Sequence, residues 1–421
     1  MSNADTELSG TLPDGALWRL HVPTRWNGTL LLYSHGYLPD VRPPALAPSG
    51  LEPWLLQHGY ALAASSYAHG GWAIADAIPD QLATLALFTA RIAKPQRTLA
   101  WGESMGGLIT IALAERPDTP SDGALTACGS IAGTLEMMNR ALDGAFAFRT
   151  LAAPHANIRL VGTTDDRANA ARVSAALSNA LTTPQGRARV ALAGALAGLP
   201  VWTQPLTPEP PVHDYETQLT QLAQSFVAGV FLPRAEQERV AGGVFSSNTH
   251  TDYRAQLART GRRAWVSYFY RQAGLDLDHD LQVLNAAPRI CANPAAIAYM
   301  RANYVPTAKP RVPVISYHTL GDGLTSPTLQ STYSQAVRYT GFTDNFQAAW
   351  IHGAGHCTFT AGEHLAALRA LEHRLASGTW SASPDELNSL AASEHLGPAR
   401  FVAPAPDHPP RRSAGTRQSV R

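Results

Sequence analysis

The chain has 421 residues, of which 45% are hydrophobic and 15% are charged, which excludes a wholly disordered protein. Its length is normal for an α/β core that carries an insertion. The net charge of +1 gives no electrostatic reason to expect nucleic acid or an anionic membrane as a partner. No run reaches the ~18 apolar residues that a membrane-spanning helix needs. Residues 1–10 show no signal peptide, so we expect a cytoplasmic protein, although a secreted protein that had lost its signal would look the same.

Short β-rich runs alternate with helical patterns in the first part of the chain, which predicts a parallel sheet with helices on both faces. Residues 29–34 (TLLLYS) form a continuous apolar run, typical of a strand buried on both faces. We expect further strands at 16–22, 60–67, 97–101 and 125–131, and helices at 51–58, 78–93 and 105–115.

The alternation breaks near Gly133 and gives way to a mostly helical pattern, with a Pro-rich joint at 200–211. The apolar segments 190–202 and 265–270 could line a pocket, but we expect them to form the core of this insertion. Strands resume at 312–318 and 346–351, followed by a helix at 361–376. The predicted division is therefore a core at 1–134, a helical cap at 135–310, the rest of the core at 311–402, and a disordered Pro- and Arg-rich tail at 403–421.

A G-x-S-x-G motif lies where a predicted strand meets a predicted helix, at Gly102-Glu103-Ser104-Met105-Gly106. In this context the motif predicts a sharp turn that presents Ser104 as a nucleophile. The turn leaves room only for small residues two positions before and after the serine, which Gly102 and Gly106 provide. It also directs the Met105 N–H and the helix N-terminus toward a developing oxyanion.

A His-Gly pair ends the early buried strand, at His35-Gly36-Tyr37. Such a turn lets the following backbone N–H face an active site, so we expect the Tyr37 N–H to be the second oxyanion donor beside Met105. We expect His35 itself to be structural.

A serine nucleophile needs a base and an acid, which should follow it in the order acid, then histidine. Asp322 occupies a Gly-flanked turn directly after the strand predicted at 312–318. Its competitor Asp344 precedes the next strand and should lie at the opposite edge of the sheet. The sequence therefore favours Asp322 as the acid.

The base is expected in the loop after the last strand, which contains His352 and His356. His352 directly continues the strand, whereas the glycines before His356 let the loop turn inward, so we favour His356. His318 is expected to be packed within its own strand.

Together these residues resemble the α/β-hydrolase superfamily: the His35-Gly36 pair, the Ser104 elbow, Asp322 and His356 occur in the order of that superfamily. The resemblance covers roughly residues 12–134 and 311–378. It implies an α/β-hydrolase fold, with a mostly parallel eight-stranded sheet flanked by helices, and a two-step acyl-enzyme mechanism. The inserted, mainly helical cap follows from the residue pattern alone, because its residues resemble no family.

The three cysteines match no zinc site or disulfide framework, and their odd number leaves at least one unpaired. Reduced cysteines are the simpler expectation, with one disulfide left open. The His356-Cys357 pair resembles tannases and fungal feruloyl esterases, in which a cysteine after the histidine bonds one just before the serine. Glu103 precedes Ser104 here, so that bond is not available, and we expect Cys357 to be a buried small residue.

The sequence thus predicts a serine hydrolase that cleaves a small-molecule or polymeric carboxylic ester or a lactone, without cofactor or metal. An aminopeptidase or amidase, or an acyltransferase, could use the same residues, whereas a binding module is disfavoured by the complete triad. An aminopeptidase would need a cap carboxylate to hold the substrate amine, and the candidates are Glu209, Asp214, Glu216, Glu236 and Glu238. The oligomeric state is not predicted.

Overall fold

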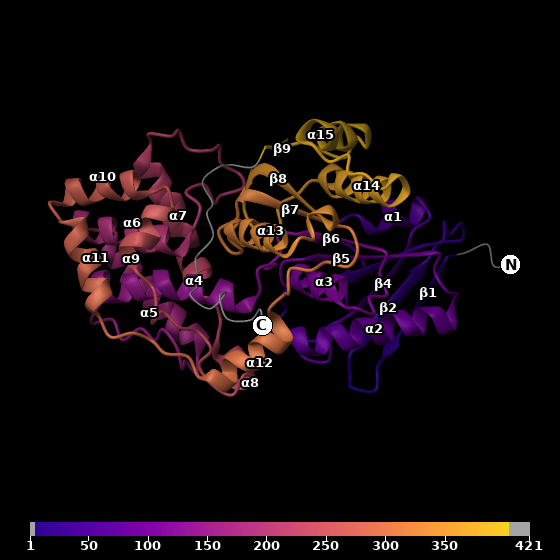
Figure 1. The fold of residues 1–421 in the computed structure, drawn as a ribbon, viewed down its shortest axis with the longest axis horizontal. Helices are drawn as coiled ribbons and strands as arrows, with labels where there is room; N and C mark the ends of the chain where they lie inside the picture. Colours follow the sequence, from indigo (N-terminus) through magenta and orange to yellow (C-terminus); the bar gives the residue numbers. More distant parts are fainter. Residues whose placement is uncertain (1–4, 404–421) are drawn as a thin grey trace.

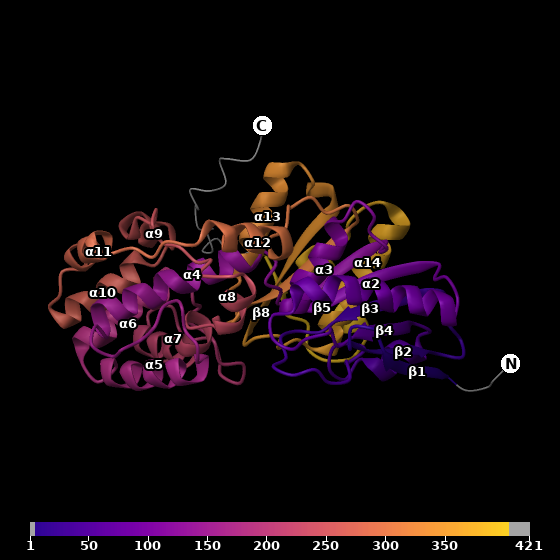
Figure 2. The same ribbon diagram turned by 90° about the horizontal axis from the view of Figure 1, so that it is seen from below.

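The computed structural model describes residues 5–403 of the chain (Figure 1). A sheet flanked by helices occupies one side of the molecule, and a helical segment occupies the other (Figures 1 and 2). The tail that the sequence predicts to be disordered lies outside the described residues, apart from Ala403.

The sheet contains nine strands among the described residues, in the order β1-β2-β4-β3-β5-β6-β7-β8-β9. Neighbouring strands from β4 to β8 run parallel, while β1, β2 and β9 pair antiparallel at the two edges. This arrangement is the α/β-hydrolase fold, with one strand more than the expected eight. The strands span Thr6–Thr11 (β1), Leu17–Val22 (β2), Thr29–Ser34 (β3), Ala61–Ser65 (β4), Arg97–Glu103 (β5), Gly123–Ala127 (β6), Val314–Gly321 (β7), Phe346–Ala354 (β8) and Phe401–Val402 (β9).

Helices cover both faces of the sheet because its central strands are apolar on both sides. In β3, Leu30 and Leu32 belong to one buried cluster while Leu31 and Tyr33 belong to another. The first cluster is closed by α2 (Ile74–Arg91), α3 (Met105–Glu115) and α13 (Thr328–Thr340). The second is closed by α1 (Glu52–Gln57), α14 (Ala361–Ser377) and α15 (Pro384–Ser393).

The segment between β6 and β7 is helical and has a hydrophobic core of its own. Both apolar segments of the sequence analysis, 190–202 and 265–270, contribute to this core, as expected. The helices span Thr134–Ala147 (α4), Asp166–Ala180 (α5), Pro184–Ala197 (α6), Tyr215–Val230 (α7), Ala235–Val240 (α8), Tyr253–Arg259 (α9), Arg263–Ala273 (α10), Leu277–Ala286 (α11) and Pro294–Tyr304 (α12), with a π-helical turn at Phe148–Ala152.

Helix α4 joins the two parts of the molecule. Met137 and Met138, near its start, belong to the core against the sheet, whereas Phe146, near its end, belongs to the core of the helical segment. The helical segment is therefore anchored to the sheet by a continuous helix rather than by loops alone.

Strand β6 ends four residues earlier than the expected range of 125–131. The chain turns sharply at Cys128, whose φ of 45° lies in the left-handed region. This turn brings the Ser130 N–H to within 3.2 Å of the Ser104 carbonyl oxygen, so it supports the segment that carries the predicted nucleophile.

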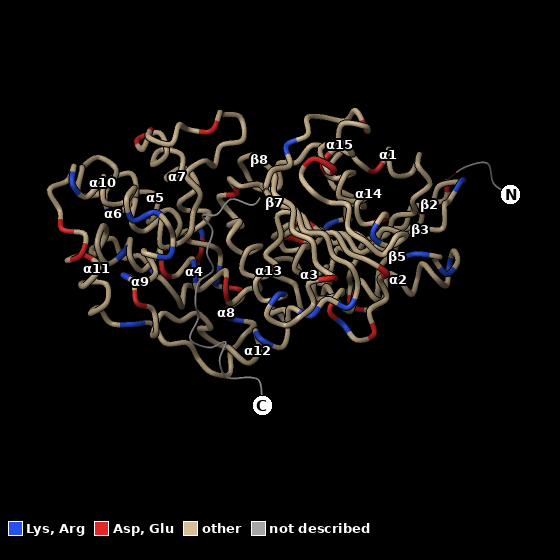
Figure 3. Tube along the Cα trace, turned by 45° about the horizontal axis from the view of Figure 1, so that its top comes forward, with Lys and Arg blue, Asp and Glu red and all other residues tan. Residues whose placement is uncertain are grey.

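Basic and acidic residues are interspersed over both parts of the molecule (Figure 3), in keeping with the near-neutral net charge. Within residues 5–403, none of the helices combines the length and the apolar character that crossing a membrane requires.

Candidate active site

Ser104 sits in a strained turn between β5 and α3. Its φ of 57° and ψ of −120° are unusual for a residue with a side chain, which marks it as a site where the fold imposes the conformation. A Cβ atom on Gly102 would lie 2.2 Å from the Gly106 carbonyl oxygen, and one on Gly106 would lie 1.9 Å from the Ser34 carbonyl oxygen. Both glycines are therefore required sterically, as the motif predicts.

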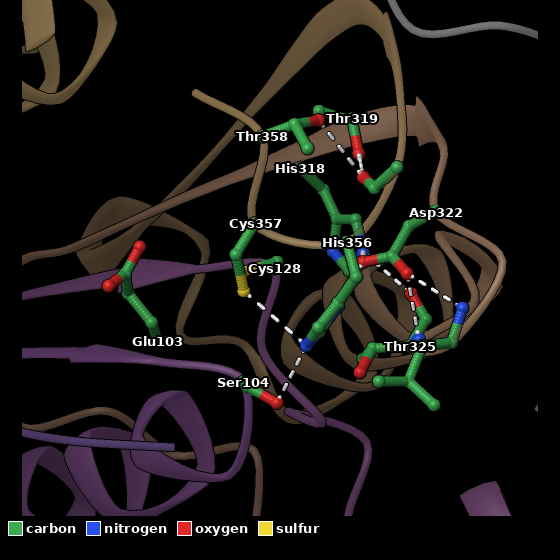
Figure 4. The surroundings of a disulfide bond; sticks show 12 residues. Glu103, Ser104, Cys128, His318, Thr319, Asp322, Thr325, His356, Cys357 and Thr358 are labelled. Carbon is green, nitrogen blue, oxygen red and sulfur yellow. Dashed lines mark hydrogen bonds and ion pairs between the residues drawn. A yellow bond between two sulfur atoms is a disulfide. The ribbon is translucent and has the colours of Figure 1, made fainter. Parts of the chain in front are cut away.

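Ser104, His356 and Asp322 form one chain of hydrogen bonds (Figure 4). The His356 Nε2 atom lies 2.9 Å from the Ser104 Oγ atom, and the His356 Nδ1 atom lies 2.7 Å from the Asp322 Oδ2 atom. The loops that carry these side chains follow β5, β7 and β8, and they meet because the carboxyl ends of parallel strands lie at one edge of the sheet.

Asp322 is fully buried, and both of its carboxylate oxygens have hydrogen-bond partners. The Oδ1 atom accepts hydrogen bonds from the backbone N–H groups of Leu324 and Thr325, each at 2.9 Å. Burial alone would raise the pKa of Asp322, but the charge of His356 and hydrogen bonds from His318 and His356 hold that pKa at about 2. The acid is therefore ionised throughout the neutral range.

Ionised Asp322 determines which nitrogen of His356 carries the proton. Burial lowers the pKa of His356, but the charge and hydrogen bond of Asp322 outweigh burial and raise it. A carboxylate accepts and does not donate, so the proton lies on Nδ1 and the Nε2 lone pair faces the Ser104 hydroxyl group. This tautomer can remove the serine proton.

His318 contacts the acid in a way that the sequence analysis did not foresee. It is fully buried in β7, as expected, but its Nε2 atom lies 3.2 Å from Asp322 Oδ2 and 2.7 Å from the Thr325 carbonyl oxygen. Both neighbours are acceptors, so Nε2 carries the proton and donates to them. The only sequence signal for this contact was the spacing, because His318 lies four residues before Asp322 in the strand that ends at Gly321.

The two rival residues lie elsewhere. The His352 Nε2 atom lies 2.7 Å from a carboxylate oxygen of Glu209, and its ring packs against Trp202 at a centroid distance of 5.0 Å. Asp344 lies in the 3₁₀ turn Thr343–Asn345 before β8, at the opposite edge of the sheet from Ser104.

The predicted oxyanion donors flank the serine. A Cβ atom on Gly36 would lie 3.2 Å from the Ser104 Cβ atom, so the His35-Gly36-Tyr37 turn lies directly against the nucleophile. Met105 is the first residue of α3, so its N–H has no carbonyl partner within the helix. His35 stacks on Tyr67 at a centroid distance of 4.2 Å and its Nε2 atom lies 3.2 Å from the Ser66 carbonyl oxygen, as expected of a structural residue.

The expectation of an unpaired Cys357 is wrong, because Cys357 forms a disulfide bond with Cys128 (Figure 4). Cys128 directly follows β6, the neighbour of β5 in the sheet, so the bond joins the loop of His356 to the strand beside the one that leads to Ser104. Cys291 is exposed and unpaired. Both bonded sulfur atoms lie near His356, but sulfur atoms joined to each other are not available as thiolate ligands for a metal ion.

The helical segment packs tightly on the loops that carry Asp322 and His356. A Cβ atom on Gly321 would lie 2.2 Å from the Trp202 carbonyl oxygen, and one on Gly355 would lie 3.2 Å from Pro205 side-chain atoms. Glycines beside the acid and the base therefore permit this close approach, and the Pro-rich joint borders the site.

The strand order and the sequence of functional groups along the chain define a member of the α/β-hydrolase superfamily. No known protein-family model matches the chain. In an alignment 435 positions long, the chain is 30% identical to o-phthalyl amidase of Xanthobacter agilis, and the alignment covers 95% of this chain and 94% of the relative. The chain belongs to the same family as this amidase.

Similar solved structures include esterases and lipases. An esterase from Aspergillus oryzae is 13% identical, covers 89% of this chain and 80% of its own, and has a TM-score of 0.44. Lipase A of Candida antarctica in its closed state is 14% identical, covers 92% of this chain and 85% of its own, and has a TM-score of 0.40.

Proposed function

We propose that the protein is a serine hydrolase that cleaves a carboxylic acyl bond through an acyl-enzyme on Ser104. The observation that carries this proposal is the hydrogen-bonded chain from Ser104 through His356 to buried, ionised Asp322. Serine is a weak nucleophile unless a base is hydrogen-bonded to it, and the base needs a third group to fix its tautomer.

The reaction proceeds in two halves. The Ser104 Oγ atom attacks the substrate carbonyl carbon while His356 takes the serine proton, and the Met105 and Tyr37 N–H groups stabilise the oxyanion. His356 then donates that proton to the leaving group, which departs and leaves the acyl group on Ser104. In the second half His356 removes a proton from water, the hydroxide attacks the acyl-enzyme, and the proton returns to Ser104 as the carboxylic acid leaves.

The family relationship favours an amide as the bond that is cleaved. The relative is an o-phthalyl amidase, and an o-phthalyl group is a benzoyl group that carries a carboxyl group at the ortho position. We therefore place o-phthalyl amides first among the substrates to be tested. The ester hydrolysis predicted from the sequence is the second candidate, because an ester uses the same triad and has a better leaving group.

We favour an amidase over an aminopeptidase, because no carboxylate of the helical segment stands out as the partner of a substrate amine. The five carboxylates that could have held a substrate amine are all engaged by other groups of the protein. Glu209 contacts His352, Glu216 contacts Arg187, Glu238 contacts Arg234, Glu236 accepts a hydrogen bond from the Trp72 N–H, and Asp214 caps α7. An o-phthalyl amide makes no such demand, because its additional charged group is a carboxylate.

We further propose that residues 135–310 act as a cap that selects the substrate. This role is supported by the close contacts of the Pro-rich joint with the loops of Asp322 and His356. A change in that joint would alter the space beside the acyl group without altering the three catalytic side chains.

The first test combines covalent labelling with a substrate panel. A fluorophosphonate probe should label Ser104 in the wild type, as located by peptide mass spectrometry, and should not label the Ser104→Ala variant. Turnover should be measured on an o-phthalyl anilide, on the benzoyl anilide that lacks the ortho carboxyl group, and on p-nitrophenyl butyrate. Faster cleavage of the o-phthalyl than of the benzoyl anilide supports the amidase, and cleavage of the butyrate alone supports the esterase. Labelling elsewhere, or unchanged turnover in Ser104→Ala, would overturn the triad.

A further inference from the structure

A second largely buried carboxylate, Glu103, directly precedes the nucleophile and has no part in the mechanism above. Its side chain is 15% exposed and points into the core between the sheet and α14. Burying a carboxylate costs free energy unless hydrogen-bond donors or positive charges lie beside it, so the cost of burying Glu103 depends on its neighbours.

A tyrosine hydroxyl group donates to this carboxylate, and a histidine ring lies near it but beyond hydrogen-bond distance. The Tyr33 hydroxyl group donates to Glu103 Oε2 at 2.6 Å, and the His364 Nε2 atom lies 3.8 Å from Glu103 Oε1. Tyr317 determines the tautomer of His364. Because the Tyr317 hydroxyl oxygen accepts from the Trp101 Nε1–H at 3.1 Å, its own proton is free to bond His364 Nδ1 at 2.8 Å.

His364 is therefore a neutral ring whose remaining N–H faces Glu103. Burial lowers the pKa of His364 to about 3, so this ring carries no positive charge at neutral pH. Burial raises the pKa of Glu103, while the Tyr33 hydrogen bond and the positive charge of His356 oppose that rise. The titratable side chains that face Glu103 are Tyr33 on β3 and His364 on α14, with Tyr317 on β7 behind His364. No lysine or arginine forms an ion pair with Glu103 within residues 5–403.

The Cys128–Cys357 disulfide separates this carboxylate from the base. Figure 4 shows the disulfide between Glu103 and His356, and the Cys357 Sγ atom lies 3.4 Å from His356 Nε2. A disulfide carries no ionisable proton, so it does not itself relay a proton between the two groups. It does not screen the field between them, because it is a low-dielectric spacer.

We propose that Glu103 is a positioning residue for the catalytic base: a carboxylate behind the disulfide whose ionised form stabilises the imidazolium that arises when His356 takes the Ser104 proton. Asp322 stabilises the same cation from the Nδ1 side, so the ring lies between two carboxylates, of which only Asp322 is hydrogen-bonded to it. Burial lowers the pKa of His356, and the field of Glu103 acts with Asp322 to raise it. This inference rests on the proposed role of Ser104 and His356.

The test measures the rate at which a fluorophosphonate probe labels Ser104 as a function of pH, so it does not depend on the identity of the substrate. In Glu103→Gln, the acid limb of the rate profile should move to lower pH by about half to one unit, because the imidazolium loses a nearby anion. The plateau rate should fall about three- to tenfold, because His356 becomes a weaker base. Glu103→Asp keeps the charge and should restore the position of the limb.

Glu115→Gln is the matched control. Glu115 also accepts a hydrogen bond from a tyrosine, at 2.8 Å from the Tyr333 hydroxyl group, but it lies at the far end of α3 from Ser104. This variant should leave the acid limb in place. If Glu103→Gln does not fold, Tyr33→Phe replaces it and should shift the limb in the same direction by less, because Glu103 is then neutral over more of the pH range.

The outcomes separate the two proposals. An unshifted limb in a folded Glu103→Gln protein, or in Tyr33→Phe where Glu103→Gln does not fold, overturns the role of Glu103 while leaving the triad intact. An equal shift in Glu115→Gln also overturns it. Absence of Ser104 labelling in the wild type would instead contradict the proposed function.

Discussion

Replacing Asp322 with asparagine should inactivate the enzyme by reversing the tautomer of His356. The Oδ1 atom of Asp322 accepts two backbone N–H groups, from Leu324 and Thr325. An asparagine must keep its oxygen on those two donors, so its NH₂ group takes the place of Oδ2 and faces His356 Nδ1 at a distance of 2.7 Å in the present structure. An NH₂ group only donates, so Nδ1 would have to become an acceptor and the ring proton would move to Nε2.

The size of the expected loss in turnover follows from the role of that proton. With a proton on Nε2, His356 can donate to Ser104 but cannot remove the serine proton, so attack proceeds without its base. In serine hydrolases this tautomer reversal lowers turnover by about 10⁴-fold, which corresponds to about 5.5 kcal/mol of transition-state free energy. Asparagine is nearly isosteric with aspartate and keeps both backbone contacts. The His318 N–H loses Oδ2 as an acceptor but keeps the Thr325 carbonyl oxygen at 2.7 Å, so we expect the folded structure to persist.

The assay is turnover of p-nitrophenyl butyrate by Asp322→Asn, with fluorophosphonate labelling of the same sample and circular dichroism to establish folding. Asp344→Asn is the control, because Asp344 lies at the other edge of the sheet, and it should stay within about twofold of the wild type. A folded Asp322→Asn protein that keeps a tenth or more of wild-type turnover would refute the tautomer argument.

Three further predictions concern the surroundings of the site. Replacing Cys128 and Cys357 with alanine should lower the free energy of unfolding by about 2–4 kcal/mol and reduce turnover, because the disulfide closes a long loop and holds the loop of His356 in place. The control Cys291→Ala should match the wild type in chemical denaturation, because Cys291 is unpaired. Equal stability of all these variants would contradict a stabilising role for the disulfide. Gly106→Ala should abolish both turnover and Ser104 labelling, because its Cβ atom would lie 1.9 Å from a backbone oxygen, and normal labelling would show that the turn can relax. His364 has a folded-state pKa of about 3 against an ordinary value of 6.5, so between these values the unfolded state binds more protons than the folded state. The free energy of unfolding should therefore fall as pH drops through that window, by roughly 3 kcal/mol from pH 6.5 to 4. His364→Gln should remove this contribution from denaturation curves measured across the window, and an unchanged pH dependence would refute it.

The sequence was informative wherever a steric or topological requirement determined the residue type. The elbow could be recognised because only glycine fits at positions 102 and 106, and the order of acid and base follows from a parallel sheet whose loops meet at one edge. His356 could be preferred to His352 because the preceding glycines let the loop turn inward, and the structure places only His356 beside Ser104.

Features that depend on contacts between distant segments could not be predicted. Cys128 and Cys357 are separated by 229 residues, and nothing in their spacing indicates that they pair. The edge strands β1 and β9 lack the apolar pattern of the central strands, since β1 is mostly exposed and β9 has only two residues. His318 has the composition of an ordinary strand residue, and only the turn after β7 brings Asp322 back onto it.

The helical segment is inserted at the position in the sheet that couples it to the site. It leaves at the carboxyl end of β6, the strand beside the one that leads to Ser104, and it returns at the amino end of β7, the strand that leads to Asp322. The outgoing junction donates the Ser130 N–H to the Ser104 carbonyl oxygen, and the Pro-rich joint packs against Gly321 and Gly355. A movement of the segment would therefore reach the backbone of the acid and base loops directly, whereas the disulfide ties the base loop to β6 of the sheet. If the helical segment selects the substrate as proposed, it can diverge in sequence while the disulfide keeps the loop of His356 fixed to the core.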